Sequence, residues 1–165
     1  MENFEMILED FNKDQLDNLI FRELGLNKLA VKSSHFFDKE SNKDIEFYQV
    51  RSFQDLLSPF GTGNILLYSI ELGYEVHDVI MIFSFDEILG DITFNFSEKE
   101  LYKGEKSEIS IRITKMLHFL INLKSKFNIP KIKIGFEPAY DKANCLVEIA
   151  KDEIDVKNIM KILLQ

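Results

Sequence analysis

The chain has 165 residues, of which 45% are hydrophobic and 29% charged, and its formal net charge is −8 at pH 7. This length and composition predict one globular domain, residues 1–165, and exclude a disordered tail. The acidic balance argues against nucleic-acid binding, which needs clustered Lys and Arg, and against an anionic membrane surface. It favours a basic protein partner, because complementary charges speed and orient association.

The cellular compartment follows from three features of the sequence. Cys145 is the single cysteine, so no intramolecular disulfide can form and a reducing compartment is expected. The first residues lack the positive and apolar regions of a signal peptide, and no apolar run approaches the roughly 18 residues that a membrane span needs. The sequence therefore predicts a cytoplasmic protein.

The N-terminal third is predicted to contain short elements. Leu16, Ile20 and Leu24 fall at helical spacing between Asn12, which can cap the start of a helix, and Gly25, which can end it. Alternating apolar residues and turn signals predict strands on both sides of this helix. The expected elements are a strand at 4–9, a helix at 12–25, strands at 30–37 and 44–51, and a helical turn at 52–57.

The middle of the chain is predicted to form an antiparallel meander with strands at 64–72, 75–85 and 88–96. Gly73 and Tyr74 supply a tight turn between the first two strands. In the third strand the apolar residues alternate with polar ones, which puts one face in the core and the other in water. The segment 79–83 is apolar on both faces and is therefore expected to be the central strand.

The last third is predicted to begin with a capping box, in which Ser97 caps a helix and Glu100 reaches back to it. A long amphipathic helix near 105–127 follows, because its apolar residues share one face. Pro130 ends this helix, and strands at 132–136 and 145–150 and a closing helix at 153–164 complete the chain. The predicted fold class is α+β: an antiparallel β-meander packed against a long amphipathic helix, with flanking N- and C-terminal helices.

No catalytic residue, metal site or cofactor site is predicted. The histidines His35, His77 and His118 fall on different predicted elements, and only Cys145 could add a thiolate ligand. Cys145 also lacks a neighbouring group that would activate it, so it is expected to be inert.

The charge pattern along the chain is the strongest functional signal. Residues 61–100 contain eight carboxylates and one basic residue, whereas residues 101–133 contain eight bases and two acids. A surface that only keeps a protein soluble normally intersperses both signs, so this segregation indicates an acidic interface. The alternative is a solvated sheet face that discourages edge pairing. The predicted partner-binding residues are Glu75, Asp78, Asp86, Glu87 and Asp91.

The stretches EVHDVIMIFSFDEILGDITFNFSEKELY (75–102) and GFEPAYD (135–141) resemble the small acidic immunity proteins of bacterial polymorphic-toxin and contact-dependent inhibition systems. This resemblance implies tight, stoichiometric binding to a cognate toxin domain, often a basic nuclease, with no activity of the chain's own. Two other functions stay open from the residues. One is a small enzyme that uses the carboxylates around 75–91, and the other is a self-associating regulatory or scaffold domain.

Overall fold

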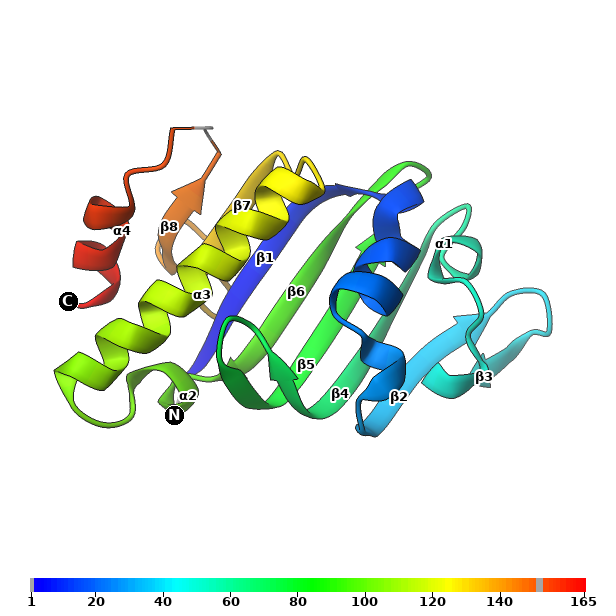
Figure 1. Cartoon of the computed structure of the whole chain (residues 1–165). Helices are drawn as coiled ribbons and strands as arrows, with labels where there is room; N and C mark the ends of the chain where they lie inside the picture. The colour runs from blue at the N-terminus through cyan, green and yellow to red at the C-terminus, as the bar shows by residue number, and fades with distance from the viewer. Residues whose placement is uncertain (1, 151–152) are drawn as a thin grey trace.

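The fold is organised by one eight-stranded antiparallel sheet with the strand order β3-β2-β4-β5-β6-β1-β7-β8. The structure, a computed structural model, describes residues 2–150 and 153–165 (Figure 1). The predicted α+β class with an antiparallel sheet is confirmed. The strands are β1 (Asn3–Asn12), β2 (Val31–Asp38), β3 (Lys43–Ile45), β4 (Gly61–Glu71), β5 (Glu75–Phe85), β6 (Leu89–Ser97), β7 (Lys131–Phe136) and β8 (Cys145–Ile149).

The predicted meander is confirmed, since β4, β5 and β6 are neighbours in chain order. The first strand of the chain then lies beside the last strand of the meander. Phe4 on β1 stands opposite Phe96 on β6 and Phe136 on β7. β1 therefore joins the meander to the two C-terminal strands, a pairing between distant segments that local patterns do not reveal.

The helices lie in front of the sheet in the view of Figure 1. They are α1 (Phe53–Leu56), α2 (Lys99–Tyr102), α3 (Lys106–Lys126) and α4 (Val156–Leu163), with shorter turns η1 (Lys13–Gln15), η2 (Asn18–Glu23), η3 (Leu26–Lys28) and η4 (Phe47–Gln49). Within the described residues, no helix is long and apolar enough to cross a membrane.

The longest helix, α3, begins with a capping box in which Glu105 and Glu108 satisfy each other's backbone amides. The side chains that it buries over the sheet are Ile113, Met116, Leu117, Leu120 and Leu123. They join one core cluster with Ile92, Phe94 and Phe96 on β6. This cluster holds the helical layer on one face of the sheet.

The turn between β4 and β5 is fitted closely against α3. Gly73 has a φ of +91°, and a Cβ at this position would lie 2.2 Å from the carbonyl oxygen of Lys115. Only glycine meets both conditions, because other residues are strained at this φ and have no room for a side chain. The glycine therefore fixes how the hairpin approaches the helix.

Two predicted elements differ from the structure. Residues 12–25 form the 3-10 turn η1 and the π-helical turn η2, with the amide of Leu24 bonded to the carbonyl of Leu19 at 2.9 Å. The apolar spacing shows which side of this segment faces the core, but it does not distinguish between helical hydrogen-bond patterns. The predicted strand at 44–51 ends at Ile45, because Glu46 and Gln49 form the capping box of η4.

Candidate partner-binding surface

The five predicted partner-binding carboxylates do not form one cluster, since four lie on β5 or in the turn after it and Asp91 lies on β6. Glu75 begins β5, whereas Asp86 and Glu87 follow its other end. At about 3.3 Å per strand residue, Glu75 and Asp86 are roughly 35 Å apart. The acidic sequence segment therefore forms two separate sites at the ends of a strand.

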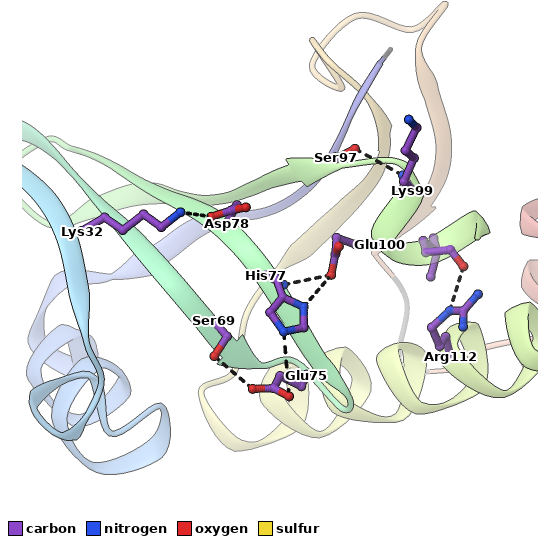
Figure 2. A network of polar contacts seen from close by, with 10 residues as sticks. Lys32, Ser69, Glu75, His77, Asp78, Ser97, Lys99, Glu100 and Arg112 are labelled. Atoms are coloured by element: carbon purple, nitrogen blue, oxygen red, sulfur yellow. Dashed lines mark hydrogen bonds and ion pairs between the residues drawn. The ribbon is translucent and has the colours of Figure 1, made fainter. Parts of the chain in front are cut away.

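At the first end, His77 lies between two carboxylates, Glu75 and Glu100 (Figure 2). Its Nδ1 is 3.1 Å from Glu100 Oε2, and its Nε2 is 4.0 Å from Glu75 Oε2. Ser69 on the neighbouring strand donates to Glu75 at 3.1 Å. All three side chains of the His77 group are at least partly exposed, so a partner can reach them.

The predicted capping box of Ser97 and Glu100 is wrong, because Glu100 binds β5 instead. The carboxylate accepts hydrogen bonds from the backbone amide of His77 at 2.9 Å, and Glu98 is the residue that precedes α2. Ser97 Oγ does accept from the amide of Lys99, at 3.4 Å. Glu100 therefore ties α2 to β5 and does not cap the helix, a long-range contact that the local spacing cannot predict.

Asp78 lies at an irregularity in β5, with a φ of +52°, opposite Tyr68 on β4. Its side chain is 66% exposed and forms an ion pair with Lys32 of β2 (Figure 2). The ammonium of Lys32 also lies 4.9 Å from the centre of the Tyr68 ring. Asp78 is therefore an accessible carboxylate with one basic neighbour beside an exposed aromatic ring.

At the other end of β5, Asp86 and Glu87 are exposed in the turn to β6. The amide of Asp86 donates to the carbonyl of Leu89 at 2.8 Å, which closes this turn. Asp86 also borders a surface hollow of about 410 Å³ that Phe37 and Phe60 line. An acid thus stands beside exposed aromatic side chains at this end too.

Asp91 has a different environment from the other four. It is partly buried on β6 and accepts from the hydroxyl of Tyr140 at 2.7 Å and from the amide of Asp10 at 3.0 Å. Burial and the neighbouring Asp91 carboxylate raise the pKa of the Tyr140 hydroxyl. Asp91 therefore holds the segment after β7 against the sheet.

This segment, residues 137–144, lies over β1 and β6 on the sheet face opposite the helices. The amide of Ala139 donates to Glu5 Oε2 at 2.8 Å, and Asn95 donates to Glu5 Oε1 at 3.0 Å. Glu5 on β1 and Thr93 and Asn95 on β6 are buried as a result. We call the side chains of β2, β4 and β5 on this same face the open sheet face.

The segment 79–83 has one face in the core and the other on the open sheet face. β5 is central, as predicted, but Ile80 and Ile82 point away from the helices and are 36% and 40% exposed. Tyr68 on β4 is 55% exposed. A strand that is apolar on both faces is therefore central in the sheet without being buried on both sides, and an exposed apolar face of this kind is typical of a binding surface.

The residues considered for metal or nucleophile chemistry are scattered. His35, His77 and His118 lie on β2, β5 and α3. In the described ranges, no three His, Cys, Asp or Glu side chains are grouped as metal ligands would be. Burial raises the pKa of the Cys145 thiol on β8, which disfavours the reactive thiolate.

Comparisons with known proteins show the family to which the chain belongs. The fold is similar to a chain in the crystal structure of the toxic C-terminal tip of CdiA from Pseudomonas aeruginosa in complex with immune protein. The TM-score is 0.63 at 16% identity, with 94% of this chain and 98% of that chain covered. A search of curated proteins finds no match. The family model of the PABL017 Cdi1I immunity protein matches residues 2–152, so the chain belongs to this immunity protein family.

Proposed function

We propose that this protein neutralises a cognate toxin domain by binding it, as an inhibitor and not as an enzyme. The observation that carries the proposal is the match of the immunity protein family over residues 2–152. The structure with the similar fold supports it, because there the toxic tip of CdiA is in complex with an immune protein. We further propose that binding takes place in the cytoplasm, as the lone Cys145 suits a reducing compartment.

The partner that we propose is basic and of the nuclease type. The net charge of −8 supports this choice, since an acidic inhibitor and a basic toxin attract each other over long distances. The partner-binding residues are Glu75, Asp78, Asp86, Glu87 and Asp91. Asp78, Asp86 and Glu87 are exposed and can act as rim charges, whereas Asp91 contributes by positioning Tyr140.

We propose that the helical layer serves as the support of this binding surface. The long helix α3 is amphipathic in this reading, since it buries Leu117 and Leu120 over the sheet and leaves His118 exposed. The flanking η1–η3 turns and α4 occupy the same layer in Figure 1. A sheet that is packed against helices on one face stays rigid, so it loses less conformational entropy when a partner binds the other face.

The test is a calorimetric titration with the cognate toxin domain, which we expect to be encoded by the gene adjacent to this chain's gene. We expect the wild type to bind with one-to-one stoichiometry, and the double reversal Asp78→Lys and Asp86→Lys to weaken binding by about 2–5 kcal/mol if one carboxylate is desolvated in the complex. The matched control is Glu2→Lys with Glu153→Lys, two exposed acids outside the proposed surface. Absence of binding by the wild type contradicts the proposed function.

A further inference from the structure

The open sheet face carries a group of accessible apolar side chains on β4 and β5, namely Leu66, Tyr68, Ile80 and Ile82. Leu66 stands opposite Ile80, and Asn64 stands opposite Ile82, so these residues form adjacent rows on β4 and β5. Tyr68 extends this group toward Asp78, and beyond the polar pair Thr62 and Ser84 the rings of Phe37 and Phe60 line the hollow beside Asp86. Single exposed apolar residues are ordinary, but a contiguous group rimmed by polar residues marks a binding site.

The chain covers the neighbouring part of the same face, over β1 and β6, with its own residues. Segment 137–144 is held there by Glu5 and Asp91, and Ile7 beneath this part is fully buried. Within the described residues, no segment is fastened in the same way over Ile80 and Ile82. The apolar side chains on β4 and β5 therefore remain accessible to a partner.

The size of the open sheet face suits one side of a protein interface. β4 and β5 have 11 residues each and β2 has 8. With strands about 4.8 Å apart, two of roughly 35 Å and one of roughly 26 Å give a projected area of about 450 Å². A stable interface takes about 800 Å² from each partner, so the surrounding rim must take part as well.

The rim contains two of the acids that were expected to bind the partner, each near a lysine, with Lys32 paired to Asp78 and Lys39 lining the hollow that Asp86 borders. Asp78 stands beside Tyr68, and Asp86 borders the hollow lined by Phe37 and Phe60. The combination is the usual arrangement of an interface, with an apolar centre and a charged edge. The charges at the edge determine which partner fits.

We infer that the toxin domain docks on the open sheet face, with Tyr68, Ile80 and Ile82 at the centre of the contact. This inference rests on the proposed function and names its surface. The matching surface of the toxin is an apolar protrusion surrounded by Lys and Arg, which reach Asp78 and Asp86. A second copy of this chain fits less well, because a symmetric contact brings like carboxylates near each other.

The experiment compares Ile82→Arg with Ile111→Arg in a titration against the adjacent-gene toxin domain. Ile82 is on the open sheet face, whereas Ile111 is 56% exposed on α3 in the helical layer. Both changes place the same charged side chain at an exposed isoleucine. The unfolding midpoint of each variant establishes that it is folded, and Tyr68→Thr with Ile80→Thr is a second variant that introduces no charge and keeps β-compatible residues.

We expect Ile82→Arg to weaken binding about tenfold or more, as truncating or blocking a central contact does, and Ile111→Arg to bind like the wild type. The threonine pair should weaken binding in the same direction. If the wild type, Ile82→Arg and the threonine pair bind the toxin with equal affinity, the toxin does not dock on the open sheet face, although the proposed function still holds. A wild type that self-associates and becomes monomeric through Ile82→Arg also overturns it, and a wild type that never binds the toxin overturns the function itself.

Discussion

The backbone amide of Ala139 donates a 2.8 Å hydrogen bond to the carboxylate of Glu5, a buried side chain on the first strand of the chain. Asn95 binds the second carboxylate oxygen. One acid thus joins β1, β6 and the segment that covers part of the sheet face. The boundary between the covered part and the open sheet face depends on this contact.

We predict that Glu5→Leu destabilises the fold by about 2 kcal/mol or more, because it leaves the Ala139 amide and the Asn95 side chain as buried donors without a partner. Urea unfolding measures the loss. Glu148→Leu is the control, since Glu148 is an exposed carboxylate on β8. Equal stability of the two variants would show that the covering segment is not held through Glu5.

Leu120→Ala should lower the free energy of unfolding by about 2–5 kcal/mol, the usual loss for a truncated core leucine. Leu120 is fully buried in the cluster that contains Phe94. Ile111→Ala on the exposed side of the same helix should change stability by less than about 0.5 kcal/mol. An unchanged unfolding midpoint for Leu120→Ala contradicts the packing of α3 on the sheet.

Gly73→Ala should destabilise more than Gly25→Ala. Both glycines have positive φ, +91° and +60°, but only at Gly73 does a Cβ meet a backbone atom, the Lys115 carbonyl oxygen. The loss of stability in Gly25→Ala therefore measures conformational strain alone, about 1 kcal/mol. The additional loss in Gly73→Ala measures the clash with α3. Equal losses in chemical denaturation would place the β4–β5 turn away from the helix.

Alkaline pH should destabilise the protein through Tyr102. Burial raises the pKa of Tyr102 to about 12 from its ordinary value of 10.0. The folded state holds the Tyr102 proton more tightly than the unfolded chain does. The stabilisation of the fold that results is fully present below pH 10.0 and is lost as pH rises toward about 12. Tyr102→Phe should flatten the fall in unfolding free energy over this interval, whereas Tyr48→Phe, at an exposed ring, should not. Parallel curves for Tyr102→Phe and wild type would contradict the assignment.

The sequence predicts the regular elements well, because their signals are local. Strand 75–85 and helix 105–127 match β5 and α3 closely, since alternation and helical spacing directly record which side of an element is buried. The helix at 12–25 was predicted in the right place, but its hydrogen-bond pattern depends on packing that spacing does not encode. The position of β1 between β6 and β7 also depends on distant segments.

The candidate surface is only partly readable from sequence. The charge pattern drew attention to Asp78 and Asp86, which are indeed exposed. It could not show that Asp91 accepts a hydrogen bond from Tyr140, or that Glu100 binds His77. Both contacts join elements that are distant in the sequence. The sequence placed Ile80 and Ile82 in a central strand, but it could not show that they are exposed, since apolar residues occur both in a core and in an interface.

The most direct measurement of the central claim is growth protection. Bacteria that express the adjacent-gene toxin domain are grown with this protein, with the Ile111→Arg control and without either. The account predicts that the wild type and the control restore growth, and that the double reversal Asp78→Lys and Asp86→Lys restores it less. If toxin-expressing cells grow no better with the wild-type protein than without it, while the protein accumulates in folded form, the account is contradicted.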